Sequence, residues 1–535
     1  MQITTIFAEV VLKKTENGCT LPDEIDNIIQ GDIEMSEQKN QPEQVQEVKP
    51  EVIFEQRKAK IAEFEAAGLK PYGTRYDGAI PTAEAKKLYV EESETQAKVN
   101  VAGRMTAFRA MGKAVFADVK DSSGRIQLYV SRDAVGEEFF KLFKKFDIGD
   151  IIGVEGELFK TRTGEITIKA EKCTLLSKSL RTLPEKYHGL VDQEQRYRQR
   201  YLDLIMSEES KEVFKKRFAI IREVRRFLES KGFMEVETPM LQNISGGANA
   251  RPFITRYEAL NSNMYMRIAP ELFLKRLLVG GFEKVFELNR NFRNEGVDRR
   301  HSPEFTMIEI YQAYGNCEVM MDLIEEMVTT VAMKVNGTLE TTMPDGTVIN
   351  LQRPWKRATY RDLVKEKAGA DWFDLSRDEK AARAKEMGAV IPDDFNDLEI
   401  THEVYEKLIE HTLIQPTFVL RMPEYLVPLA KKCEDDPTVV DVFELEINGQ
   451  EVSPGYSELN DPIEQRKRFL EQAKLNDREG ELQKTIDEDF LCAMEYGMPP
   501  AGGMGIGIDR LVMLLTGRDS IRDVILFPHL RGKQS

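Results

Sequence analysis

The residues best suited to chemistry lie in a short segment that follows an apolar strand at 285–288. The segment reads Phe-Arg-Asn-Glu at 292–295 and Arg-Arg-His-Ser-Pro-Glu-Phe at 299–305. A guanidinium fits phosphate oxygens, an aromatic ring offers a stacking surface, and a carboxylate accepts from an exocyclic amine. A polyphosphate on a flat base would use all three groups. A surface hairpin with many ion pairs has the same composition, so this segment alone leaves both interpretations open.

A second segment, residues 499–511, is rich in glycine and ends in Arg510. The apolar run that follows predicts a helix, and phosphate binds well near a helix N-terminus. Most glycine-rich turns serve packing, and this one lacks the Lys-Ser/Thr of a P-loop and the spacing of a dinucleotide fingerprint. A third segment, 232–239, follows an amphipathic helix near 210–231 and carries no chemistry of its own.

In their order and spacing, these three segments resemble motifs 2, 3 and 1 of the class II aminoacyl-tRNA synthetases. Longer runs at 264–272, 309–311, 456–461 and 521–528 resemble the bacterial lysyl-tRNA synthetases. The resemblance extends from about residue 55 to the C-terminus and is specific, because several long motifs agree at once. It implies an enzyme that activates L-lysine with ATP and transfers it from lysyl-adenylate to the 3′ end of tRNA(Lys).

The resemblance also assigns the nucleotide-binding residues. Amino-acid activation needs no general base, because the substrate carboxylate itself attacks the α-phosphate of ATP. Catalysis is therefore mostly positioning and charge neutralisation. By their places in the motifs, Arg293 would bridge the α-phosphate and the amino-acid carboxylate, and Arg510 would hold the γ-phosphate. Glu295 and Phe305 would take the adenine, and His301 would lie against the phosphates.

Glu444 and Glu451 lie near the two ends of a predicted hairpin, whose turn is Asn448–Gly449. Two acids that flank a hairpin commonly form a solvated edge. The resemblance instead identifies them as ligands of Mg²⁺, a hard cation that prefers carboxylate and phosphate oxygens.

A lysine-binding pocket must contain several acids, because a buried ammonium is costly unless it is paired. The resemblance implies a pocket of three acids, two tyrosines and a glycine that gives a backbone contact to the amino-acid end. These residues are Glu271, Glu309, Glu458, Tyr311, Tyr456 and Gly247. An aspartate-specific relative would need basic residues there instead.

Four positions depart from the family pattern. Pro454 stands where most of the family has an asparagine that contacts the amino acid. Arg421, Tyr425 and Val427 replace an acid, a glutamate and a serine. We expect these changes to bear on lysine affinity and not on the class of the enzyme.

The N-terminal part of the chain is predicted to form a β-barrel. Five short strands are predicted at 99–106, 113–120, 125–131, 151–160 and 165–176, with turn signals at 122–124 and 163–164. They predict an OB-fold, whose face binds single-stranded nucleic acid. Phe116 is a candidate stacking platform for the anticodon and Gln127 a candidate reader of base edges. An aromatic residue in a sheet is more often core, and it is the resemblance that favours binding.

The chain as a whole is predicted to be an α+β protein with an N-terminal OB-fold barrel and a class II catalytic domain, an antiparallel sheet flanked by helices. Residues 1–50 are expected to be a disordered acidic extension, and 51–95 a helical segment. The OB-fold domain would occupy 96–180, a charged linker 181–205, and the catalytic domain 206–535, with a helical insertion at about 320–440. Within the insertion, 376–387 is the clearest helix. Met35 is a plausible start in its own right, so residues 1–34 are expected to be an unusual extension or a misassigned start.

The charge of the chain is unevenly distributed. The net charge is −16 over 535 residues, and an even distribution would argue against nucleic acid. Residues 1–55, however, hold twelve acidic residues against four lysines. Basic residues cluster at 57–60, 178–181 and 196–200, and local patches decide phosphate contact. Each cluster could equally be a solvated helix face.

Composition also favours a cytoplasmic protein. Hydrophobic residues make up 41%, which is ample for two or more domains. The five cysteines show neither a CxxC pair nor zinc spacing, which is typical of a reducing compartment. No apolar run is long enough to span a bilayer, and residues 1–11 are a poor signal peptide because Glu9 interrupts them. The resemblance further implies a homodimer with motif 1 at its interface.

Two other functions remain open at this point. Some relatives with this catalytic fold attach lysine to a protein such as an elongation factor, and they resemble the catalytic domain alone. A synthetase-like protein that only binds RNA is a further possibility. The predicted barrel argues against the first, and the intact Arg293, Glu295, Arg510, Glu444 and Glu451 argue against the second.

Overall fold

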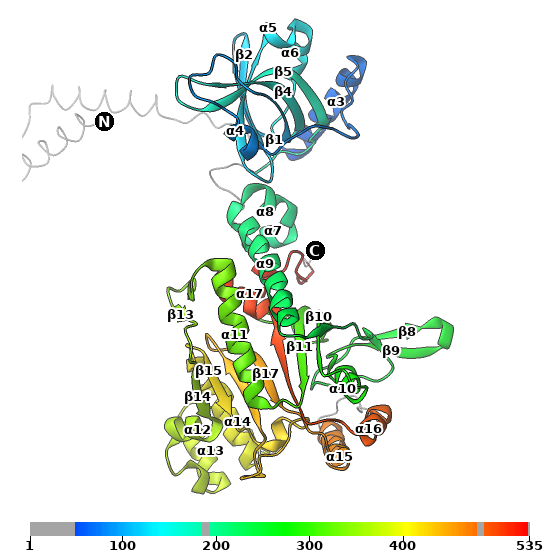
Figure 1. The fold of residues 1–535 in the computed structure, drawn as a ribbon, viewed down its shortest axis with the longest axis vertical. Helices are drawn as coiled ribbons and strands as arrows, with labels where there is room; N and C mark the ends of the chain where they lie inside the picture. The colour runs from blue at the N-terminus through cyan, green and yellow to red at the C-terminus, as the bar shows by residue number, and fades with distance from the viewer. Residues whose placement is uncertain (1–48, 185–191, 479–485, 533–535) are drawn as a thin grey trace, which may run out of the picture. The chain divides into compact units, whose positions relative to one another are not determined.

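The computed structural model describes residues 49–184, 192–478 and 486–532. The chain divides into two compact units, Met1–Leu183 and Pro184–Ser535 (Figure 1). The disordered extension that the sequence predicts at 1–50 lies outside the described residues, apart from its last two positions.

The first unit is built around a closed five-stranded barrel, and this prediction is confirmed. Its strands are β1 (Lys98–Met111), β2 (Ala114–Lys120), β3 (Arg125–Ser131), β4 (Ile151–Lys160) and β5 (Ile166–Ser177). They close in the order β1-β2-β3-β5-β4, with β3 and β5 parallel and the other pairs antiparallel. A bulge between Met105 and Ala107 bends β1, so that one long strand pairs with both β2 and β4.

Alternation of side chains along each strand fills the barrel. In β2, Val115, Ala117 and Val119 are fully buried, while Phe116 between them is only partly buried. In the described part of this unit, four helices accompany the strands: α3 (Pro50–Ala66), α4 (Thr82–Lys87), α5 (Arg132–Val135) and α6 (Glu137–Phe143). Phe64 of α3 and Phe143 of α6 belong to the same apolar core as the barrel interior.

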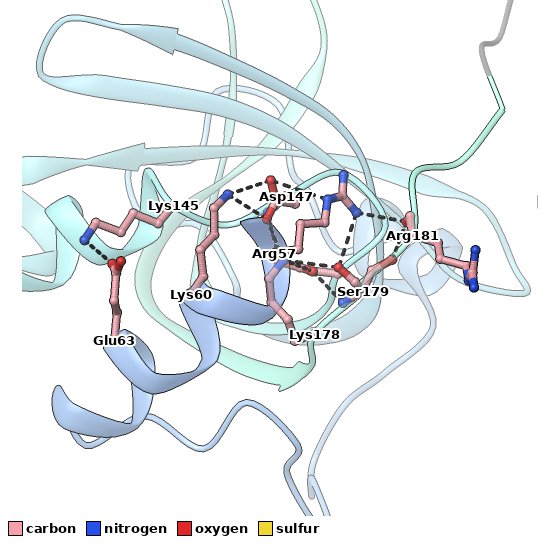
Figure 2. A network of polar contacts seen from close by, with 9 residues as sticks. Arg57, Lys60, Glu63, Lys145, Asp147, Lys178, Ser179 and Arg181 are labelled. Carbon is pink, nitrogen blue, oxygen red and sulfur yellow. Dashed lines mark hydrogen bonds and ion pairs between the residues drawn. The ribbon is translucent and has the colours of Figure 1, made fainter. Parts of the chain in front are cut away.

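An ion network fixes α3 to the barrel (Figure 2). Arg57 donates to the carbonyl oxygens of Ser179 and Arg181, at 3.2 and 2.9 Å. Lys60 and Lys178 both donate to Asp147, at 2.8 and 2.6 Å. Two of the basic clusters that the sequence suggests as phosphate contacts therefore use these side chains in contacts within the first unit.

The second unit is centred on an eight-stranded sheet with the order β14-β15-β16-β17-β18-β11-β10-β6 (Figure 1). Neighbours are antiparallel except at the two edges, where β6 runs parallel to β10 and β14 parallel to β15. The strands are β6 (Met234–Glu235), β10 (Lys284–Phe292), β11 (Glu304–Ala313), β14 (Lys356–Thr359), β15 (Thr417–Leu420), β16 (Val442–Glu446), β17 (Glu451–Ser457) and β18 (Ala501–Gly507).

Long helices cover this sheet, as the sequence predicts. Helices α9 (Glu208–Ser230), α11 (Cys317–Asn336) and α17 (Ile508–Thr516) share one apolar core with its strands. Further helices of the unit are α7 (Gln193–Arg198), α8 (Arg200–Met206), α10 (Glu271–Val279), α15 (Pro462–Arg478), α16 (Glu488–Glu495) and α18 (Ile521–Val524), besides the three in the region expected as an insertion. A separate sheet has the order β7-β9-β8, with β7 (Leu241–Gln242), β8 (Ile254–Tyr257) and β9 (Ser262–Met266).

The region expected as an insertion is more mixed than the sequence suggests. It contains α12 (Tyr360–Ala368), α13 (Arg377–Glu386) and α14 (Asp397–Leu408), which have an apolar core of their own. Ser376 and Glu379 form a capping box at the start of α13. The same region also holds β14 and β15 of the main sheet and a hairpin of β12 (Glu340–Thr342) and β13 (Val348–Asn350). Strands of three or four residues leave too little periodicity to detect. The expected linker likewise contains α7 and α8.

A helix that crosses a bilayer must be both long and apolar. None of the helices in the described ranges meets both conditions.

Candidate active site

The pairing of β11 with β18 brings motif 2 and motif 3 together. Met307 lies opposite Gly507 and Glu309 opposite Gly505. At the end of this pair, Asp509 of α17 accepts hydrogen bonds from the Thr306 backbone N–H at 2.7 Å and from Arg217 of α9 at 2.6 Å. Because Asp509 and Arg217 are both buried, this contact holds three elements in one arrangement beside the motif 2 loop.

One pocket gathers all five residues that the sequence assigns to the nucleotide. Those residues are Arg293, Glu295, His301, Phe305 and Arg510. The pocket is also lined by Glu451, one of the two expected metal ligands, and by the small residues Gly505 and Gly507 of motif 3.

Arg293 is positioned for an anionic ligand. Its guanidinium carbon lies 5.1 Å from the centre of the Phe305 ring, so the two side chains share one wall of the pocket. Its Nε is buried and, among the described residues, makes no hydrogen bond. Burial lowers the pKa of Arg293, although Glu295 and Glu451 oppose that shift. A buried guanidinium with an unused donor is what a phosphate or carboxylate oxygen would satisfy.

The other nucleotide residues lie around this centre. Arg510 donates to the backbone carbonyl of Glu451, which ties the start of α17 to β17. The His301 imidazole is half exposed, and its Nδ1 lies 2.8 Å from Oδ2 of Asp298. Asp298 also accepts from the backbone N–H groups of Arg300 and His301, so it shapes the motif 2 loop. Glu295 is exposed at the pocket wall.

The two expected metal ligands come from the predicted hairpin. Asn448 and Gly449 adopt the left-handed backbone that a two-residue turn requires, and β16 pairs with β17 across it. Burial, Glu451 and Glu410 together raise the pKa of Glu444 to about 8. A neighbouring acid that the sequence did not suggest, Glu446, is almost fully buried.

The chemistry of this acid cluster fits a hard cation. A divalent ion would relieve the repulsion that helps to raise the pKa of Glu444, and carboxylate oxygens are the donors that Mg²⁺ prefers. Among the described residues, no group of three or more His, Cys, Asp or Glu side chains could hold a metal by itself. An ion at Glu444 and Glu451 would therefore need oxygens from a phosphate or from water.

The three acids that the sequence assigns to lysine, here called the acid pocket, are each at least nine-tenths buried. Glu271 accepts from the Tyr456 hydroxyl at 2.6 Å, and Glu309 accepts from the Tyr311 hydroxyl at 3.0 Å. Glu458 completes the group, and its Oε1 makes no hydrogen bond within the described part of the chain. The structure thus brings five of the six residues expected to bind lysine into one hydrogen-bonded or electrostatically coupled group.

Two glycines make room for this pocket. A Cβ on Gly503 would lie 2.0 Å from Glu458 Oε1 and 2.6 Å from the Tyr311 ring, so only glycine is tolerated there. Gly247, the sixth expected residue, has a left-handed φ of +86° and lies against the Cβ of Glu271. Part of the glycine-rich segment therefore makes room for protein side chains, which is the packing role that the sequence left open for it.

Burial and repulsion raise the pKa values of two of these acids. Burial and the charge of Glu271 place the pKa of Glu309 well above its usual range. Burial raises the pKa of Glu458 to about 8, against the lowering effect of Lys275. A cationic ligand would favour the ionised form of both.

The four departures from the family pattern lie in different places. Pro454 lines the nucleotide pocket and stands opposite Glu444 in the sheet. Arg421 forms an ion pair with Asp435 at 2.8 Å, and the Tyr425 hydroxyl donates to the Leu398 carbonyl. Val427 packs against the core of the α12–α14 region. Of the four, Pro454 is therefore the one with a direct place at the pocket.

Sequence reasoning missed three buried charges that organise the site. Lys275 contacts two of the pocket acids, and Arg217 and Asp509 hold motif 2 to motif 3. The spacing of Lys275, four residues after Glu271 on one helix, was a usable signal. Arg217 and Asp509 are 292 residues apart, and no local pattern could have paired them.

The two residues expected to read the anticodon lie on adjacent strands of the barrel. The Phe116 ring lies 5.1 Å from that of Tyr129, which in turn lies 5.9 Å from Phe159. The three rings form an aromatic row across β2, β3 and β4. The Gln127 side-chain oxygen accepts from the Thr167 hydroxyl at 2.9 Å. Because Phe116 is only partly buried, its ring differs from the barrel core residues on either side of it.

Comparisons with known proteins agree on both units. A family described as "tRNA synthetases class II (D, K and N)" matches residues 192–531, and "OB-fold nucleic acid binding domain" matches 99–176. The chain is 52% identical over 479 residues to the "Lysine--tRNA ligase" of Carboxydothermus hydrogenoformans, covering 89% of this chain and 97% of the relative. It is 50% identical over 485 residues to the protein of the same name from Staphylococcus saprophyticus, covering 89% and 98%.

Proposed function

The chain belongs to the class II tRNA synthetases and, within them, to the lysine–tRNA ligase family, and we propose that it joins L-lysine to the 3′ end of tRNA(Lys) in two steps. ATP and lysine first give lysyl-adenylate and pyrophosphate, and the lysyl group then passes to a terminal hydroxyl of the tRNA. The observation that carries this proposal is the buried pocket of Glu271, Glu309 and Glu458 beside the arginine-lined nucleotide pocket.

Strand β11 relates the two pockets. Phe305 and Thr306, near its start, line the nucleotide pocket, and Glu309 and Tyr311 further along belong to the acid pocket. A lysine whose ammonium groups lie among the acids would therefore direct its carboxylate toward Arg293. In this arrangement Arg293 holds the attacking carboxylate and the α-phosphate together, and Arg510 neutralises the γ-phosphate.

Magnesium belongs to this proposal as a cofactor. Glu444 and Glu451 would hold the ion, and bound Mg²⁺ would neutralise charge on the phosphates of ATP. Arg293 and Arg510 then add the positive charge that the phosphoryl oxygens need from the protein.

The experiment that tests the function is ATP–pyrophosphate exchange with each amino acid in turn, followed by transfer to tRNA. Exchange with lysine and transfer to tRNA(Lys) are expected. Exchange without transfer to tRNA, but with transfer to a protein, would indicate a protein-lysylating ligase, and no exchange at all would indicate an RNA-binding protein. The OB-fold barrel favours tRNA as the acceptor, because barrels of this kind bind single-stranded nucleic acid.

We propose that the barrel binds the anticodon through Phe116. Aminoacylation of tRNA and pyrophosphate exchange, both measured on Phe116→Ala, test this role. Phe116→Ala should weaken aminoacylation, because base stacking is worth roughly 1–3 kcal/mol per ring. It should leave lysine-dependent pyrophosphate exchange unchanged, because that reaction needs no tRNA. Gln127→Ala should also relax discrimination among anticodon bases, since an amide reads base edges.

The matched control for Phe116 is Phe140, a buried core residue of the same unit. Phe140→Ala should lower the melting temperature of the protein, whereas Phe116→Ala should not. Equal losses in both assays for Phe116→Ala, with early melting, would make Phe116 a core residue and remove the anticodon assignment.

We also propose that the enzyme is a homodimer through its motif 1 surface. The edge strand β6 leaves one side without a neighbour in the main sheet of the described chain, and Met234 on it is exposed. Leu241, Ile254, Tyr257 and Leu260 are exposed as well, and the β8–β9 hairpin projects from the body of the unit (Figure 1). An edge strand next to exposed apolar side chains suits a self-complementary interface.

A solution mass of two copies is therefore expected, and Met234→Asp should shift it toward one copy. Met333→Asp is the matched control, because Met333 is 49% exposed against 52% for Met234 but lies on α11. A fully active wild-type monomer at assay concentrations would contradict the dimer.

The proposal places the enzyme in the cytoplasm, where tRNA is charged. Four cysteines in the described residues, Cys173, Cys317, Cys433 and Cys492, are free thiols, which agrees with a reducing compartment.

A further inference from the structure

Lys275 is a fully buried cation inside the acid pocket. Its Nζ lies 2.7 Å from Glu271 Oε1 and 2.5 Å from Glu458 Oε2, and 5.5 Å from the centre of the Tyr456 ring. Both partners are themselves buried, so the three side chains form a desolvated group of charges. Such a group is costly to build, and removing one member would leave an uncompensated charge.

The pocket has few other ionisable groups. Helix α10 contributes Glu271 and Lys275, and β11 contributes Glu309 and Tyr311. Tyr456 comes from the end of β17, and Glu458 follows that strand directly. Burial raises the pKa values of both tyrosines well above their usual range, so they stay neutral. Three carboxylates and one ammonium remain, and they leave two negative charges when all of them are ionised.

Two negative charges match the two ammonium groups of lysine. The substrate also carries a carboxylate, which the proposed function directs to Arg293. Burial and nearby acids raise the pKa of Glu309 well above its usual range and that of Glu458 to about 8. Lys275 opposes the shift at both acids, so it favours the ionised form that a cationic substrate needs.

We propose that Lys275 is a positioning residue for substrate recognition, a permanent counter-ion that holds Glu271 and Glu458 in place and lowers the cost of ionising the acids around it, so that the group binds an amino acid with two ammonium groups. This role rests on the proposed function, because it assumes that the pocket takes lysine. It acts through the glutamates, and the contacts of Lys275 are with protein groups and not with the nucleotide pocket.

The sign of the pH dependence follows from the raised pKa values. Below its pKa, Glu458 is neutral and binds an ammonium poorly, so the KM for lysine should fall as the pH rises from 6 toward 8.5. In Lys275→Met, Glu309 and Glu458 lose a nearby cation that lowers their pKa values, so both pKa values rise further. The fall in KM should then move to higher pH. Because the ionised fraction of a carboxyl below its pKa falls tenfold for each pH unit, a rise of one in the pKa should increase the KM at pH 7 by about tenfold.

The test is the KM and kcat of lysine-dependent pyrophosphate exchange between pH 6 and 8.5. We expect Lys275→Met to raise KM at pH 7 and to leave kcat nearly unchanged. The pH range over which KM falls should shift to higher pH. Lys380→Met is the matched control, since Lys380 is similarly buried and pairs with Asp397 at 2.7 Å away from the site. Lys380→Met should lower the melting temperature without changing the pH range over which KM falls.

If Lys275→Met lowers kcat but leaves the pH dependence of KM unchanged, the variant has a general folding defect. That result would overturn the counter-ion role. A wild-type enzyme that does not use lysine at any pH would instead contradict the proposed function, so the two failures are distinguishable.

A second variant covers the case in which Lys275→Met does not fold. Lys275→Ala leaves a cavity that fits n-propylammonium, and this cation should restore the wild-type KM. Equal restoration by n-propanol would show that the volume matters and not the charge, and would also contradict the proposal. Wild-type enzyme with n-propylammonium is the control for competition with lysine.

Discussion

Replacing Arg293 or Arg510 with alanine is expected to lower lysyl-adenylate formation by orders of magnitude. A donor aimed at developing charge is typically worth about 10²–10³ in rate, and each arginine is proposed to contact the phosphates of ATP. The buried Nε of Arg293, which makes no hydrogen bond within the described residues, indicates that the protein does not already use this donor. The melting temperature should change little for Arg293→Ala, because the partners that are lost are ligand oxygens. Arg510→Ala also loses the hydrogen bond to the Glu451 carbonyl, so a modest fall in its melting temperature is expected.

Arg217 is the matched control for these two variants. It is a buried arginine of the same unit, and its partners are Asp509 and the Thr306 hydroxyl. Arg217→Ala should therefore lower the melting temperature, because Asp509 would keep a buried charge without its partner. Single-turnover adenylate formation and thermal melting on the three variants separate the two roles. An Arg293 variant that melts early yet activates lysine at the wild-type rate would make Arg293 a structural residue.

The second large effect is expected at Glu309. Glu309→Gln removes a buried partner for an ammonium of lysine, and losing one member of a buried charged pair costs about 2–5 kcal/mol. That range corresponds to a loss of roughly 30-fold to several thousandfold in kcat/KM for lysine. The amide can still accept from the Tyr311 hydroxyl, so the wall of the pocket should keep its geometry.

Glu325 is the matched control for Glu309. It is equally buried, and it binds Arg353 and the backbone N–H of Trp355 away from the pocket. Glu325→Gln should affect stability and not the kcat/KM for lysine. Unchanged lysine activation in Glu309→Gln would remove Glu309 from the substrate pocket.

Local signals in the sequence account for much of the fold. The strands of the barrel follow from period-two alternation and clear turn residues, and the hairpin at Asn448–Gly449 follows from its dipeptide. The short strands β12 to β15 were missed. β12 and β13 pair locally but are too short to show a periodicity, and β14 pairs with β15 far along the chain. The parallel pairing of β3 with β5, which closes the barrel, was not predicted, because it follows from no local pattern.

The site could be assembled from the sequence only through the family resemblance. Residue types at 293, 305 and 510 suggested phosphate chemistry, but their convergence depends on the pairing of β11 with β18. The charge balance of the acid pocket was beyond reach, because it requires knowing that Lys275 points toward Glu458, 183 residues away. The need for glycine at position 503 likewise depends on distant side chains, those of Tyr311 and Glu458.

The central claim is that this chain attaches lysine to tRNA(Lys), and one measurement tests it directly. Purified enzyme, ATP, Mg²⁺, total tRNA and all twenty amino acids are incubated together, and the charged tRNAs are identified by sequence and by the mass of the attached amino acid. We expect lysine to be the attached amino acid, and we expect only tRNA species with lysine anticodons to be charged. A different amino acid on tRNA, or lysine consumed with no charged tRNA, would contradict it.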